Sequence, residues 1–173
     1  MEEKACCGTK KPEKTYSIKD YWPLICLVLV SMASALTLSF NGRGIDFVLW
    51  MHHFMGIFLV IFATLKLFKL SGFAHGFAKY DLLASRHIFF GYLYPFVELA
   101  LGLGYLSLTY LSFVYAGTII VFGIGLIGVL IGLKKGLDMA CPCMGAILSV
   151  PLSTVTVVEN GLMVIMAVSM FYM

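Results

Sequence analysis

Charged residues are scarce in this chain: Asp, Glu, Lys and Arg together make up 12% of its 173 residues. A soluble globular domain carries about a quarter charged residues, so the composition excludes that class. Hydrophobic residues make up 61% of the chain, and its mean hydropathy is +0.96. The sequence therefore predicts an all-α integral membrane protein with little room for a second globular domain.

Several chemical signatures are also missing. The chain has no serine elbow, phosphate-binding loop or HExxH motif, which excludes the common hydrolase, kinase and metalloprotease classes. The glycines of GIGLIG, residues 123–128, lie within an apolar run rather than after a strand, so we expect no nucleotide cofactor. No basic stripe interleaves with aromatic residues, which argues against nucleic acid as a partner. We also expect no removable signal peptide, because no short apolar core precedes a small-residue cleavage site.

The chain contains five long apolar segments. A membrane-spanning helix needs about 20 residues, so each segment is a candidate span. A polar tail occupies residues 1–20, and a single transmembrane domain is expected from residue 21 to residue 173. Within it we expect a five-helix bundle in the lipid bilayer, with spans at about 22–40, 45–70, 87–108, 111–133 and 146–173. The loop after the second span is expected to form a short interfacial helix anchored by Phe73, Phe77 and Leu82.

Basic residues predict the orientation of the bundle. Eleven of the twelve Lys and Arg residues fall on one side of the five predicted spans, and Arg43 falls on the other. Basic residues favour the cytoplasmic side, so we expect a multi-pass protein of the cell (inner) membrane with its N-terminus in the cytoplasm. The eleven are Lys4, Lys10, Lys11, Lys14, Lys19, Lys66, Lys69, Lys79, Arg86, Lys134 and Lys135.

Two cysteine pairs fall on the predicted cytoplasmic side, where thiols stay reduced. Cys6 and Cys7 are adjacent in the tail, whereas Cys141 and Cys143 flank a proline. The proline restricts Cys141 to extended conformations, and residues two apart in an extended segment point the same way. Both sulfur atoms can therefore face one soft metal ion such as Cu(I) or Hg(II), or one incoming thiol. Cys26, in contrast, is expected to be a small apolar residue of the first span.

Two acids are expected inside the membrane. Glu98 and Glu159 lie roughly 12–17 Å along their spans, near the middle of a core about 30 Å thick. Such groups face the bundle interior and indicate a functional site, which here extends to Asn160. The acids can share a proton or pair across helices. Alternatively, each is protonated and bonds to a Tyr or Thr, which stabilises the bundle.

A further polar group lies near the other end of the second span. His52 and His53 are flanked by Met51 and Met55, a combination that suits a soft-metal entry site. From that end of the bundle toward the predicted cytoplasmic side, the Met/His group is followed by the acids and then by the cysteines. This order resembles a series of sites that could pass a soft cation from one to the next. The alternative is that these histidines are hydrogen-bonded polar groups and these methionines fill the core.

Four stretches carry a resemblance to a known family: WMHHFMGIFLVIFATLKL (50–67), GFAHGFAKYDLLASR (72–86), YPFVELALGLGYL (94–106) and CPCMGAILSVPLSTVTVVENGLMVIMA (141–167). In these the chain resembles the MauE/DoxX-like redox-associated membrane proteins, in particular the branch associated with heavy-metal-associated domains. The matching pattern includes Glu98, Cys141, Cys143 and Glu159-Asn160. The resemblance implies a membrane component of thiol redox chemistry or heavy-metal handling, close to the methylamine-utilisation maturation proteins.

Three hypotheses for function follow. The leading one is a protein that binds a soft heavy-metal ion and translocates it or hands it over to a metal chaperone, and is therefore not an enzyme. In it, Cys141 and Cys143 form the exit site, Cys6 and Cys7 act as a mobile carrier, and the two acids form the midplane step. The second is a thiol–disulfide oxidoreductase in which Cys141 and Cys143 cycle with a thioredoxin-like partner. The third is an assembly scaffold, and a homo-oligomer is compatible with all three.

Overall fold

The computed structural model describes residues 22–40, 44–78, 88–134 and 152–172, with the side chains of the last range described from Val155 onward. In these ranges the chain forms six α-helices and no strand, which confirms the predicted all-α class. The helices are α1 (Trp22–Leu38), α2 (Phe47–Phe68), α3 (Leu70–Phe77), α4 (Ile88–Ser107), α5 (Leu111–Lys134) and α6 (Leu152–Tyr172).

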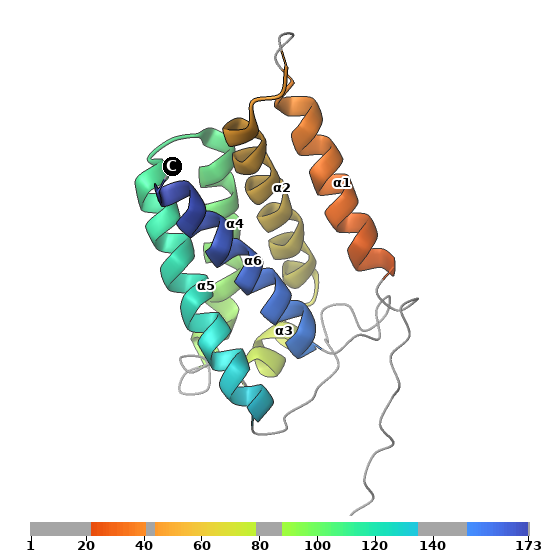
Figure 1. Ribbon diagram of the computed structural model, residues 1–173. Helices are drawn as coiled ribbons and strands as arrows, with labels where there is room; N and C mark the ends of the chain where they lie inside the picture. The colour runs from red at the N-terminus through yellow and green to blue at the C-terminus, as the bar shows by residue number, and fades with distance from the viewer. Residues whose placement is uncertain (1–21, 41–43, 79–87, 135–151, 173) are drawn as a thin grey trace, which may run out of the picture.

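Five of these helices are long and run side by side in alternating directions (Figure 1). Helices α2, α4, α5 and α6 are long and apolar enough to cross a membrane. Helix α1 is a shorter apolar helix of 17 residues, which lies at the lower end of the range of about 17–25 residues that can span a bilayer. The arrangement is the five-helix membrane bundle that the sequence predicts.

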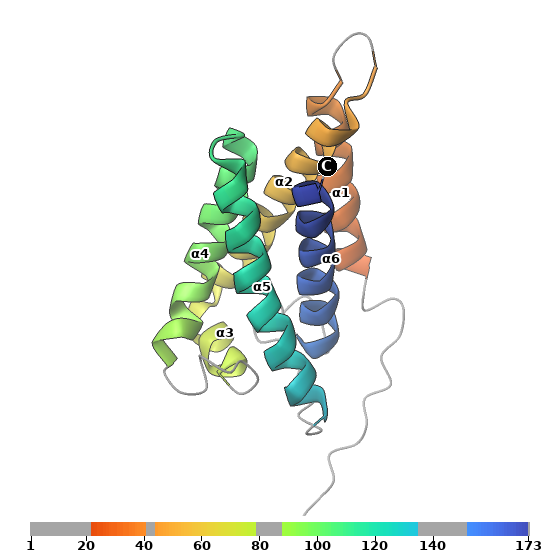
Figure 2. The ribbon, with the colours of Figure 1, turned by 60° about the vertical axis from the view of Figure 1, so that its left-hand side comes forward.

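The short helix α3 follows α2 directly and lies at one end of the bundle, near the ends of α4, α5 and α6 (Figure 2). The sequence predicts a helix here, but the expected role of its aromatic residues is wrong. Phe73 and Phe77 are buried within the protein, where they pack with Tyr94 of α4, rather than exposed to anchor α3 in lipid. Leu82 lies outside the described residues.

Helix α2 organises the core. Its buried Met55, Phe58, Leu59 and Phe62 belong to the main apolar cluster, which also takes residues from α4, α5 and α6. Helices α2 and α4 approach closely at Gly56 and Gly102, because a Cβ atom at either glycine would lie within 3.1 Å of the other's carbonyl oxygen. Among the described helices, α1 packs against α2 alone, and its buried residues are the small Ser31 and Ala35.

Candidate functional site

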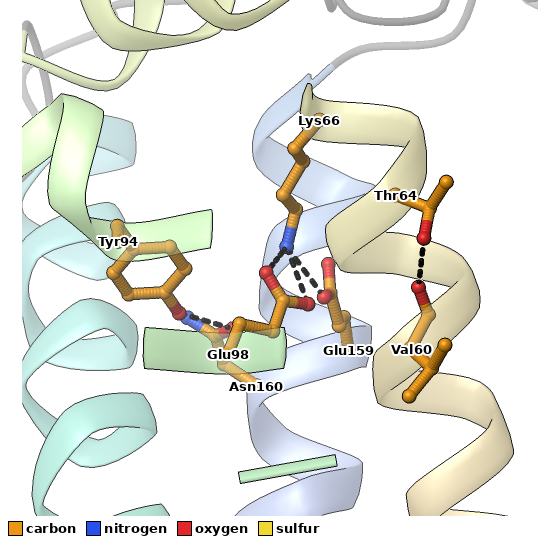
Figure 3. Close-up of polar contacts among 7 residues, drawn as sticks. All are labelled: Val60, Thr64, Lys66, Tyr94, Glu98, Glu159 and Asn160. Atoms are coloured by element: carbon orange, nitrogen blue, oxygen red, sulfur yellow. Dashed lines mark hydrogen bonds and ion pairs between the residues drawn. The ribbon is translucent and has the colours of Figure 1, made fainter. Parts of the chain in front are cut away.

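Lys66 is a buried cation in the last turn of α2, with 7% of its surface exposed. Side chains on an α-helix tilt toward the helix N-terminus, so a lysine at this end of α2 is aimed back into the bundle. Its stem runs inward and places the ammonium nitrogen between Glu98 and Glu159 (Figure 3). Lys66 thus lies at the end of the span where the sequence places it, but its ammonium group binds these acids rather than facing the loop after α2. The remaining ten basic residues on that side, against Arg43, predict the same orientation.

The ammonium group of Lys66 binds both intramembrane acids. Its Nζ donates to Oε2 and Oε1 of Glu98 at 2.7 and 2.9 Å, and to Oε1 of Glu159 at 2.7 Å (Figure 3). Glu98 comes from α4 and is fully buried, and Glu159 comes from α6 and is 3% exposed. The structure thus brings the two acids together across helices. We call Lys66, Glu98 and Glu159 the triad.

Aromatic rings form part of the wall around the triad. The Nζ atom of Lys66 lies 5.4 Å from the ring centroid of Tyr94 and 5.7 Å from that of Phe73. An aromatic face attracts a nearby cation through its quadrupole, so both rings favour the ammonium form of Lys66. Because Phe73 belongs to α3, this short helix forms part of that wall, and the side chain of Lys66 remains 8% exposed.

Asn160 lies beside the triad and is fully buried. Its Oδ1 accepts a long hydrogen bond of 3.4 Å from the hydroxyl of Tyr94, while its Nδ2 has no hydrogen-bond partner among the described residues. The space for this amide comes from Gly125 of α5, where a Cβ atom would lie 2.9 Å from Nδ2 of Asn160. Five helices, α2 to α6, therefore contribute to the surroundings of the triad.

His52 and Tyr115 form a second polar contact, nearer the other end of the bundle. Nδ1 of His52 donates to the carbonyl oxygen of Val48 at 2.7 Å, so Nε2 of the neutral ring accepts from the hydroxyl of Tyr115. Both ring nitrogens of His52 are therefore occupied within the protein.

The other members of the predicted entry site lie nearby. His53 shares a 3.1 Å hydrogen bond with Ser39 at the end of α1, and Met51 and Met55 are buried in the core. The structure brings His52 and His53 together only as neighbours in α2. A soft-metal entry site here stays a prediction.

An apolar layer separates the His52 region from the triad. In the four helices of the core, the segments between the two regions contain no polar side chain: residues 54–63, 99–104, 119–124 and 161–168. Met55, Leu59, Phe122 and Met163 fill this layer and are almost completely buried. Tyr105 and Thr118, which share a 3.0 Å hydrogen bond, lie on the His52 side of it. The described side chains therefore form no continuous polar path along the bundle.

Cys6, Cys7, Cys141 and Cys143 lie outside the described residues, and Cys26 is a free, exposed cysteine on α1. The connection that carries Cys141 and Cys143 runs from the end of α5 to the start of α6, and both helix ends lie toward the α3 end of the bundle (Figure 2). Within the described ranges, no group of three or more His, Cys, Asp or Glu residues could hold a metal ion.

Sequence reasoning missed the role of Lys66, although a signal for it was present. Lys66 lies inside the second predicted span, at residues 45–70, and an ionisable residue within a span indicates a functional site by default. Tyr94 was also missed. Its position four residues before Glu98, on the same face of the predicted span, was a signal for it, although its role depends on contacts with α2 and α6.

Comparison with known proteins gives one match. No curated protein and no solved structure matches the chain. The family described as methylamine utilisation protein MauE matches residues 45–173, which include helices α2 to α6, all members of the triad, and the pair Cys141 and Cys143. The match begins after α1 and does not distinguish a branch associated with heavy-metal domains. Most of the chain is covered, and the chain therefore belongs to the MauE family.

Proposed function

We propose that this protein is a membrane component of thiol–disulfide redox maturation, in which Cys141 and Cys143 exchange electrons with a thioredoxin-like partner. The observation that carries this proposal is the MauE family match, which covers the cysteine pair and the α2–α6 bundle as one unit. The pair belongs to the connection between α5 and α6, and the two helix ends that this connection joins lie toward the α3 end of the bundle (Figure 2). By the charge asymmetry, this end faces the cytoplasm and the protein lies in the inner membrane.

The exchange begins with a partner that holds a disulfide. A thiolate of the pair attacks one partner sulfur, which breaks the partner's S–S bond and forms a mixed disulfide. The second thiolate of the pair then attacks this mixed disulfide and releases the partner as a dithiol. Cys141 and Cys143 lose two electrons, the partner gains them, and the two thiol protons pass to the partner's sulfurs. The same steps in reverse reduce the pair.

Two features favour redox exchange over translocation of a soft metal, the leading hypothesis from the sequence. Translocation needs a route from the His52 region to the cysteines, and over that stretch the apolar layer offers a soft ion only methionine thioethers, such as those of the buried Met55 and Met163. Thiol exchange with a partner uses one end of the bundle and needs no such route. Binding of Cu(I) or Hg(II) as cargo by the cysteine pairs stays a prediction.

Alkylation trapping in growing cells tests the proposal. We expect a substantial fraction of Cys141 and Cys143 to be oxidised, and we expect Cys141→Ser or Cys143→Ser to accumulate a mixed disulfide with a thioredoxin-like protein. Cys26→Ser is the matched control, because Cys26 is an exposed cysteine on α1, outside the family match. A fully reduced pair with no mixed disulfide in either variant contradicts the proposal. If that pair also binds Cu(I), soft-metal handling becomes the better reading.

A further inference from the structure

We infer that Lys66, Glu98 and Glu159 together bind one exchangeable proton, which reaches them from the α3 end of the bundle. This site goes beyond the proposed redox function and does not depend on it. Three features of the bundle support this site: the geometry of the triad, its charge, and the apolar layer beside it.

The charges of the triad do not balance unless a proton is bound. Two ionised carboxylates against one ammonium leave a net negative charge in the bundle interior, where an unpaired charge is costly. No further cation among the described residues contacts the triad. The rings of Tyr94 and Phe73 lie against Lys66, and Asn160 and Gly125 lie behind Tyr94; none of these side chains is a cation. One proton on one of the two acids makes the triad neutral.

Hydrogen bonding indicates where that proton can reside. An ammonium group has three donors, and Lys66 uses three, on both oxygens of Glu98 and on Oε1 of Glu159. Of the four carboxyl oxygens, Oε2 of Glu159 is the one that accepts no hydrogen bond from Lys66. Oε2 of Glu98 and Oε1 of Glu159 each lie 2.7 Å from the same nitrogen, so the two carboxyl groups are close neighbours. A single proton can therefore be shared between these two carboxyl groups.

Protons have access to the triad from one end of the bundle only. The apolar layer around Leu59, Phe122 and Met163 blocks proton exchange toward the His52 end. On the other side, Lys66 starts from the last turn of α2, next to the short helix α3. Proton exchange therefore takes place at the α3 end, which is also the end where the cysteine connection joins the bundle.

Infrared difference spectroscopy of the full chain in lipid nanodiscs tests the number of protons. At neutral pH we expect the carbonyl band of one protonated, buried carboxyl group per protein, and we expect Glu159→Gln to abolish it. Lys66→Met removes the positive charge that holds one acid ionised, so the band doubles to two protonated groups. Asp46→Asn is the control, because Asp46 is an exposed carboxylate at the start of α2 that lies outside the triad.

Two results overturn the inference. One is a wild-type spectrum with no protonated carboxyl group or with two. The other is a carboxyl band that responds, in oriented proteoliposomes, to pH on the face opposite α3. The same band is expected in the Cys141→Ser, Cys143→Ser double variant. A failure of the redox proposal is therefore distinguishable from a failure of the proton site. If Lys66→Met does not fold, Glu98→Gln is the second variant: it leaves one carboxylate against one ammonium, so the band should be lost, and a band that persists contradicts the charge count.

Discussion

One lysine, Lys66, provides the positive charge that pairs with the two acids in the bundle interior. Near a helix end, a lysine in a membrane protein ordinarily extends its stem toward water. Lys66 extends inward instead, because the tilt of side chains along α2 aims it at Glu98 and Glu159. The residue thereby turns two costly intramembrane acids into a bonded cluster that joins α2, α4 and α6.

At the residue scale, a substitution at Gly125 tests the packing around Asn160, because this glycine leaves space for the Asn160 amide. In Gly125→Ala the new Cβ atom would lie 2.9 Å from Nδ2 of Asn160, so we expect a loss of about 1–3 kcal/mol of unfolding free energy. Gly123→Ala is the matched control on the same helix, since no atom lies within 4 Å of its Cβ position. Thermal unfolding in detergent measures both variants. Equal melting temperatures for the two would contradict the packing around Asn160.

At the scale of the helices, α2 and α1 differ in how many other helices they contact. Helix α2 contributes to both polar regions and to the apolar layer, and it contacts α1, α3, α4 and α6. Helix α1 packs on α2 alone, and it lies outside the residues that match the MauE family. Helix α1 is therefore attached along α2 and lies outside the part of the chain that matches the family.

This difference predicts how the protein tolerates a break in the chain. Cleavage at a protease site inserted between Gly42 and Arg43 should leave the melting temperature of the α2–α6 unit nearly unchanged, because α1 buries few of its side chains. Cleavage at the same site inserted at Thr109, between α4 and α5, breaks the connection between two core helices. This cut should lower the melting temperature. Thermal unfolding of the cleaved proteins in detergent measures both. A large loss of stability after the first cut would show that α1 belongs to the core.

At the scale of the whole molecule, the bundle is polar in two places and apolar between them. The triad lies toward the α3 end, and His52, Tyr115, Tyr105 and Thr118 lie toward the other. The layer between them is tightly filled, and the approach of α2 to α4 at Gly56 leaves no room for a polar side chain there. The described side chains therefore keep the two polar regions apart.

Because the apolar layer has no charged or hydrogen-bonding side chain and offers only methionine thioethers as ligands, we expect that the protein does not conduct soft cations. Proteoliposomes that contain it should take up Cu(I) no faster than empty liposomes, and the Cys141→Ser, Cys143→Ser variant should behave in the same way. A fluorescent Cu(I) indicator trapped inside the vesicles measures the uptake. Uptake that depends on these cysteines would restore the translocation hypothesis.

The sequence by itself determined the class of this protein and much of its layout. Low charge and long apolar runs specify membrane helices, because a bilayer accepts few other structures. The same reasoning identified Glu98 and Glu159 as interior residues, since charge within a span is costly unless it faces the bundle.

Only the tertiary structure decided that Lys66 joins these acids and that Phe73 and Phe77 pack inside the protein. It also showed that apolar residues separate His52 from the triad. These features depend on which helices are neighbours and on the direction of each side chain. Composition and periodicity along a single segment carry no information about either.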